Sequence, residues 1–111
     1  MSSTFVPERG DAVWIDLSPQ AGHEPSGRRP AVVLSPAAYN GLTGLMLICP
    51  VTSRVKGYPF EVAIPSGLLV SGVILSDQAK SVAWRARRAE FVTKLPDSVV
   101  ESIVQKLQRL L

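Results

Sequence analysis

The chain has 111 residues, a hydrophobic fraction of 46%, a single cysteine and a formal net charge of +3 at pH 7. These values predict one globular domain over residues 1–111 with a packed core, and they argue against a disordered chain. No apolar run reaches the ~20 residues that span a bilayer, and the N-terminus has no secretory signal. We therefore expect a cytoplasmic protein without a membrane segment.

The histidine and cysteine content bears directly on metal binding. His23 is the only histidine and Cys49 the only cysteine, so one chain cannot assemble a Cys/His zinc site. The acidic residues are scattered rather than clustered, which argues against a magnesium site as well. We expect a protein that works without a metal or another cofactor. Cys49 lies among apolar neighbours, which predicts a buried thiol.

The charge is unevenly distributed along the chain. Residues 28–94 contain nine Lys or Arg and three acidic residues, a local charge of +6, whereas the two ends together carry three basic and six acidic residues. A basic middle segment is what a phosphate-binding surface requires, although ordinary solvated strands and loops give the same pattern.

Short apolar runs separated by Gly, Pro, Ser and Asn predict a mainly β protein. The run 30–34 is apolar without alternation, which indicates a central strand, and residues 18–29 before it are expected to form a loop. Asn40-Gly41 is a turn signal. The expected strands are residues 12–17, 30–34, 45–50, 60–64, 72–75, 80–84 and 90–92. So many short strands favour a compact barrel or a strongly bent sheet.

The C-terminal segment changes its hydrophobic period. From Pro96 onward, apolar residues recur at spacings of three and four, which predicts an amphipathic helix packed on one side of the sheet. Ser98 and Glu101 match a capping box at its start. Trp14 and Trp84 fall in predicted strands, so we expect them in the core or at a subunit interface rather than as stacking platforms for bases.

A series of short motifs runs in a fixed order along almost the whole chain. They are Val6-Pro7, Arg9-Gly10-Asp11, Trp14, Gly22, Glu24, Gly27, Arg29-Pro-Ala-Val-Val-Leu-Ser-Pro36, Tyr39-Asn40, Thr43-Gly44, Thr52, Lys56-Gly-Tyr-Pro-Phe-Glu61, Asp77-Gln78, Lys80-Ser81 and Trp84-Arg85. In this combination the chain resembles the MazF/Kid/PemK toxins of type II toxin–antitoxin systems.

The resemblance implies a mainly β fold, an SH3-like β-barrel of the CcdB/Kid type with a C-terminal amphipathic α-helix, and a homodimer. It implies sequence-specific cleavage of single-stranded RNA, chiefly messenger RNA, which inhibits translation and growth. It also implies a cognate MazE-like antitoxin that blocks the RNA site.

Cleavage of RNA without a metal uses the 2′-OH of the substrate as nucleophile, and it needs a proton acceptor, a proton donor and positive charge on the transition state. The resemblance assigns Arg29, Thr52 and Glu24 to this chemistry. The planar guanidinium of Arg29 can hold two phosphate oxygens, and we expect it to act mainly by electrostatic stabilisation, because arginine is a poor proton shuttle.

The other two assignments leave alternatives open. Thr52 follows an apolar strand, where its hydroxyl could bond the scissile phosphate, but Ser53 is a neighbouring hydroxyl and strand alternation lets only one face the site. Glu24 is the general-base candidate if an arginine offsets its repulsion from phosphate. His23 beside it departs from the family pattern and is a second candidate for proton transfer.

Four further residues match RNA-contacting positions: Arg28, Lys56, Gln78 and Lys80. The basic side chains would neutralise phosphates and the glutamine could read base edges of unstacked nucleotides. Solvated charge and a turn hydrogen bond are the structural alternatives. The arginines of residues 85–88 would extend the basic surface or contact a second subunit.

Two other functions compete with the ribonuclease. A CcdB-like toxin with the same fold inhibits DNA gyrase and performs no RNA chemistry; Arg29 together with Thr52 favours the ribonuclease. The third candidate is a catalytically weak module that binds RNA or antitoxin.

Overall fold

The computed structural model describes residues 5–17 and 27–111. In chain order the elements are β1 (Asp11–Leu17), β2 (Gly27–Val33), α1 (Ala37–Thr43), β3 (Leu45–Thr52), β4 (Glu61–Ala63), β5 (Val73–Leu75), the 3-10 turn η1 (Ser76–Gln78), β6 (Lys80–Ala83), β7 (Glu90–Lys94) and α2 (Asp97–Gln108). Each predicted strand is therefore present, with bounds shifted by a few residues. The described helices include none that is long and apolar enough to cross a membrane.

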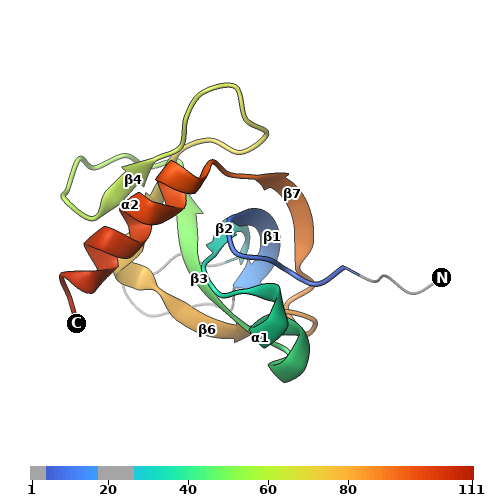
Figure 1. Cartoon of the computed structure of the whole chain (residues 1–111). Helices are drawn as coiled ribbons and strands as arrows, with labels where there is room; N and C mark the ends of the chain where they lie inside the picture. The colour runs from blue at the N-terminus through green and yellow to red at the C-terminus, as the bar shows by residue number, and fades with distance from the viewer. Residues whose placement is uncertain (1–4, 18–26) are drawn as a thin grey trace.

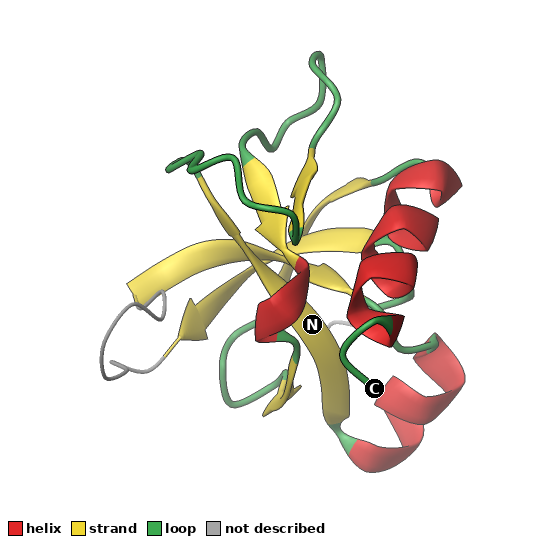
Figure 2. Cartoon of the chain, turned by 90° about the vertical axis from the view of Figure 1, so that its left-hand side faces the viewer, coloured by secondary structure: helices red, strands yellow, loops and turns green. Residues whose placement is uncertain are grey.

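All paired strands run antiparallel in one strongly bent sheet with the order β4-β5-β3-β2-β1-β7. Strand β6 pairs with the first half of β3, along the edge that β5 occupies farther on. Among the described strands no pairing joins β4 to β7, so the ladder does not close by hydrogen bonds. Figure 1 shows α2 crossing one side of these strands, and Figure 2 shows this long helix along its length, to one side of the strands. The predicted class, mainly β with a C-terminal helix, is confirmed.

The sheet buries apolar side chains on both faces. One core lies under α2 and contains Val32, Cys49 and Ile103, and the second contains Ile15, Val33 and Ile48. Neighbouring residues of β2 therefore enter different cores, because successive side chains of a strand point to opposite faces. The unalternated apolar run of β2 reflects this double burial, as predicted.

Two local predictions were wrong. Asn40-Gly41 is not a turn but lies inside α1, where the Asn40 side chain is fully buried. Its amide donates to the Pro7 carbonyl at 2.7 Å, and the Glu8 carboxylate accepts the N–H of Ala37 at the start of the helix. These partners come from the N-terminal segment, so tertiary contacts override the local turn signal. The chain reverses at Gly44 instead, which has a φ of 74°.

The predicted capping box of α2 is also absent. The helix begins at Asp97 after Pro96, and no side chain caps its first turn. Ser98 is already inside the helix, two positions after the cap position at Pro96. The amphipathic character is confirmed, since Val99, Val100 and Ile103 are buried against the sheet.

Candidate active site

The site begins where β2 begins. Sequence patterns placed Arg28 and Arg29 at the end of a loop, but both belong to β2, which starts at Gly27. They pair with β1, Arg28 opposite Asp16 and Arg29 opposite Ile15. The interstrand hydrogen bonds with β1 extend the strand beyond its apolar part. A strand holds a side chain more firmly than a loop does, so the sheet fixes the direction of each arginine.

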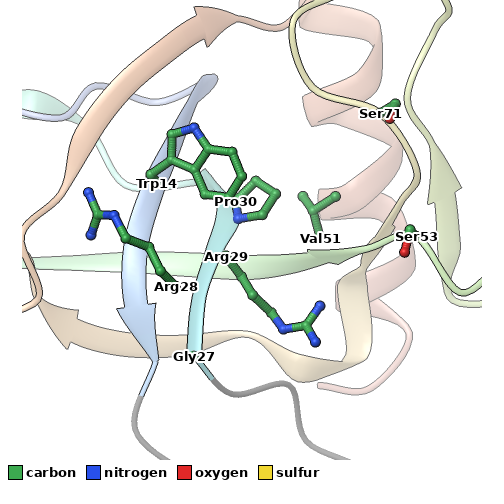
Figure 3. Close-up of a pocket in the computed structure, with 8 residues that line it drawn as sticks. All are labelled: Trp14, Gly27, Arg28, Arg29, Pro30, Val51, Ser53 and Ser71. Atoms are coloured by element: carbon green, nitrogen blue, oxygen red, sulfur yellow. The ribbon is translucent and has the colours of Figure 1, made fainter.

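Arg28 and Arg29 leave β2 in opposite directions (Figure 3). This follows from strand alternation and separates two neighbouring positive charges. Arg28 lies on the face that also carries its partner Asp16. The side chain of Arg29 leaves from the other face.

Arg28 is bound within a cluster of ion pairs. Its Nη1 donates to Oδ1 of Asp16 at 2.9 Å, and its Nη2 donates to Oε1 of Glu90 and to the Arg88 carbonyl, both at 3.0 Å. Arg88 Nε donates to Oδ2 of Asp16 at 2.7 Å. The two guanidinium groups, Arg88 first, lower the pKa of Asp16 to about 2. The cluster joins β1, β2, β7 and the turn after β6.

An open depression of about 310 Å³ lies beside the two arginines. Its lining combines charged, hydroxyl and apolar side chains from β1, β2, the end of β3 and the loop before β5. The lining residues are Trp14, Gly27, Arg28, Arg29, Pro30, Val51, Ser53 and Ser71. Guanidinium and hydroxyl groups around an open depression suit a phosphate ester, which both types of donor bind.

The two hydroxyl residues at the end of β3 occupy different places. Ser53 lines the depression, whereas Thr52 is not among its lining residues. The pairing of Ala31 with Pro50 sets the register of β2 and β3, and continuing it would place Thr52 opposite Arg29. Thr52 Oγ1 accepts the N–H of Arg54 at 3.1 Å, which turns the chain out of the strand.

Gly72, the residue just before β5, lies directly against the backbone of Thr52. Gly72 has a φ of +114°, and a Cβ there would collide with the backbone carbonyl of Thr52. Only glycine allows the two backbones to come this close. Gly72 therefore contributes to the site through its missing side chain, and the sequence pattern gave no direct sign of this.

The remaining predicted RNA contacts come from three segments that follow β3 in the chain. Lys56 is exposed in the loop after β3, Gln78 ends η1, and Lys80 opens β6 opposite Ile48. Gln78 and Lys80 thus lie close together where η1 passes into β6, and Lys56 lies in the separate loop before β4. Glu24 and His23 lie outside the described residues.

Metal binding and thiol chemistry are the other kinds of site to consider. In residues 5–17 and 27–111 no group of three His, Cys, Asp or Glu side chains could hold a metal ion. Cys49 is buried as predicted, and burial, with a smaller contribution from the charge of Asp77, raises its pKa to about 12. The thiol therefore stays protonated at neutral pH and is a poor nucleophile.

The two tryptophans differ in exposure. Trp84 is buried, and its Nε1 donates to the Asn40 carbonyl at 2.9 Å, so the prediction of a core residue is confirmed for it. Trp14 is 40% exposed and lines the depression. Asp16 was missed as a site residue, although a polar residue inside an apolar strand pattern was a usable signal for it.

Comparison with known proteins assigns the family. The model of the PemK-like, MazF-like toxins of type II toxin–antitoxin systems matches residues 8–111. The endoribonuclease toxin MazF of Escherichia coli K12 is 55% identical over 89 residues, which are 80% of this chain and 79% of that protein.

Solved structures agree with this match. A crystal structure of MazF from Deinococcus radiodurans superposes with a TM-score of 0.92 at 58% identity and covers 96% of both chains. MazF in a MazE–MazF crystal structure from that organism gives 0.87 at 58% identity, again over 96% of both chains. The predicted fold is thereby confirmed, and the chain belongs to the PemK-like, MazF-like toxins of type II toxin–antitoxin systems.

Proposed function

We propose that this chain is a metal-independent, sequence-specific endoribonuclease that cuts single-stranded RNA as the toxin of a toxin–antitoxin pair. The observation that carries the proposal is the geometry at the start of β2. There Arg29 and Ser53 help to line an open depression, and the continued register of β2 and β3 places Thr52 opposite Arg29. The E. coli relative is an endoribonuclease toxin, which supports the same activity here.

In this scheme the substrate's own 2′-oxygen attacks the adjacent phosphorus and the bond to the 5′-oxygen breaks. The leaving 5′-oxygen takes up a proton from water, which gives a 2′,3′-cyclic phosphate and a free 5′-hydroxyl. Arg29 donates to the phosphate oxygens as their charge grows, which lowers the barrier by electrostatic stabilisation. The Thr52 hydroxyl bonds the scissile phosphate, and Ser53 contacts the nucleotide beside it. Glu24 accepts the proton of the 2′-OH, with His23 as the alternative group.

RNA binding involves the loop after β3 and the segment from η1 to the start of β6. Lys56 and Lys80 neutralise phosphates, and Gln78 contacts base edges. Arg28 contributes positive charge at the depression, although its guanidinium is already bonded to Asp16 and Glu90. Its contribution to RNA binding is therefore indirect or small compared with that of Arg29.

The protein acts as a homodimeric, cytoplasmic single domain with a MazE-like antitoxin as partner. The MazE–MazF complex of the Deinococcus relative supports this choice of partner. Inhibition of DNA gyrase by a CcdB-like toxin is not favoured, because the relative from E. coli is an endoribonuclease.

The test uses purified protein and a long single-stranded RNA in EDTA. We expect cleavage at a defined short sequence, with 2′,3′-cyclic phosphate ends and free 5′-hydroxyls. Products with 5′-phosphates would show that water attacks instead of the 2′-OH. Intact RNA at high protein concentration, together with inhibited gyrase supercoiling, would contradict the proposal.

A further inference from the structure

The loop between β3 and β4 carries Lys56 and is held from its far end by a carboxylate. The N–H of Lys56 donates to Oε2 of Glu61, and the N–H of Gly57 donates to Oε1, both at 2.9 Å. Both oxygens of Glu61, the first residue of β4, are thus directed at the loop backbone. The position of Lys56 depends on this contact rather than on strand pairing.

The same loop lies along the η1 turn, which ends at Gln78. The Phe60 carbonyl accepts the N–H of Ser76 at 3.1 Å and also the Ser76 hydroxyl. Two residues earlier in the loop and one residue later in the turn, the Tyr58 hydroxyl donates to Oδ1 of Asp77 at 2.8 Å. Two consecutive contacts therefore join the loop to the turn, and the second reaches the part of the loop next to Lys56.

Both segments are also anchored to the rest of the fold. The Cys49 thiol contacts the Ser76 carbonyl, α2 packs against η1, and Lys106 Nζ of α2 donates to the Pro59 carbonyl at 2.6 Å. The turn is thus fixed by β3 and α2. The loop residues before Pro59 reach that fixed turn through Tyr58.

The Tyr58 hydroxyl is a dependable donor. Burial, followed by the hydrogen bond and charge of Asp77, raises its pKa to about 12. The group therefore keeps its proton throughout the neutral range, and the Asp77 carboxylate can only accept. A charged acceptor also makes this bond stronger than one between neutral groups.

We propose that Tyr58 is a positioning residue for RNA binding, which holds the Lys56 loop against the Asp77–Gln78 turn. Lys56 and Gln78 then meet the RNA as one preformed surface, and binding does not have to order the loop. This inference rests on the proposed function, and it adds a residue that touches neither phosphate nor base. Removing the hydroxyl should weaken RNA binding while leaving the bond-breaking step intact.

The test compares Tyr58→Phe with the wild type and with Tyr39→Phe, a matched loss of a hydroxyl on the exposed face of α1. For Tyr58→Phe we expect KM to rise about 3- to 10-fold, as loss of one hydrogen bond would predict, with kcat within about twofold. Tyr39→Phe should change neither constant. The dissociation constant of an all-2′-deoxy oligonucleotide, which cannot be cut, should rise by the same factor as KM.

A second residue tests the bond from its other side. Asp77→Asn keeps an acceptor oxygen and should stay near the wild type, whereas Asp77→Ala should match Tyr58→Phe. Adding Tyr58→Phe to Asp77→Ala should cost nothing further, because the same bond is already lost. Amide hydrogen exchange at Lys56 and Gly57 should be faster in Tyr58→Phe and Asp77→Ala than in the wild type. This measurement reports on the loop in the absence of RNA.

The outcomes separate this inference from the proposed function. A wild-type protein that leaves RNA intact contradicts the proposed function. A wild type that cuts RNA, with unchanged KM and oligonucleotide affinity in Tyr58→Phe, contradicts the positioning role alone. The positioning role would also be overturned if the effects of Tyr58→Phe and Asp77→Ala on KM multiplied in the double variant. A fall in kcat with constant KM would overturn it as well. If Tyr58→Phe unfolds at the assay temperature, Asp77→Ala decides by the same criteria.

Discussion

Two regions of this molecule hold arginines in different ways. Around Asp16, Arg28 is bonded to two carboxylates and a backbone carbonyl, and Arg88 is bonded to Asp16, so both guanidinium groups are held by contacts within the protein. Arg29 leaves the opposite face of β2 (Figure 3), and the continued register of β2 and β3 places Thr52 opposite it. The two adjacent arginines therefore have different surroundings, and we expect Arg28 to act in structure and Arg29 in chemistry.

The largest effect should come from Arg29→Ala, which removes the donor that stabilises charge on the phosphate. We expect the single-turnover cleavage rate to fall about 100- to 1,000-fold, the usual loss for one such donor. The unfolding midpoint should stay close to that of the wild type. Arg28→Ala is the matched control, with a much smaller loss of rate. Equal losses of cleavage rate in Arg29→Ala and Arg28→Ala would contradict the assignment of different roles to these two arginines.

The next effect concerns the hydroxyl region. Thr52→Val keeps the shape of the side chain, and we expect it to lower the cleavage rate about 10- to 100-fold through one hydrogen bond to a charged group. Ser53→Ala should lower it by about tenfold or less. A larger loss for Ser53→Ala would make the residue that lines the depression the phosphate contact instead of Thr52.

The close packing of the residue before β5 against the end of β3 can be tested by measuring the free energy of unfolding. Gly72→Ala and Gly67→Ala both place a side chain at positive φ, a strain of about 1–2 kcal/mol. A Cβ at Gly72 also meets the Thr52 carbonyl, whereas no atom lies within 4 Å of one at Gly67. Chemical denaturation should therefore show a lower free energy of unfolding for Gly72→Ala than for Gly67→Ala. Similar unfolding free energies for the two variants would show that β5 can move away from β3 without loss of stability.

The smallest effect belongs to the ion-pair cluster. The pKa of Asp16 is lowered to about 2 in the folded protein, so its stabilising effect is present above the ordinary pKa near 4 and is lost as pH falls to about 2. Unfolding midpoints measured across this window should fall less steeply for Asp16→Asn than for the wild type. At neutral pH the difference should be small and should shrink with salt, because Asp16 is exposed. Parallel pH curves would contradict this assignment.

Local patterns predicted the strands well because each buries a repeating set of apolar side chains. The helix after Pro96 was predictable for the same reason, since its period of three and four is independent of its partners. Asn40-Gly41 and Ser98 show the limit of such signals. The buried bonds of Asn40 reach Pro7 and Ser35, and the chain around Asn40 by itself carries no trace of them.

The sequence by itself determined the mainly β class, the C-terminal helix, the buried thiol and, through its motifs, the family. The assignment of Arg29 to the chemistry stays a prediction. Only the tertiary structure decided what Arg28 bonds to, which hydroxyl lines the depression, why position 72 is glycine and what Tyr58 holds. The physical reason is that a hydrophobic period is a property of one segment. Hydrogen bonds such as Arg28–Glu90 and Tyr58–Asp77 join residues 62 and 19 positions apart, and the sheet register decides which of them meet.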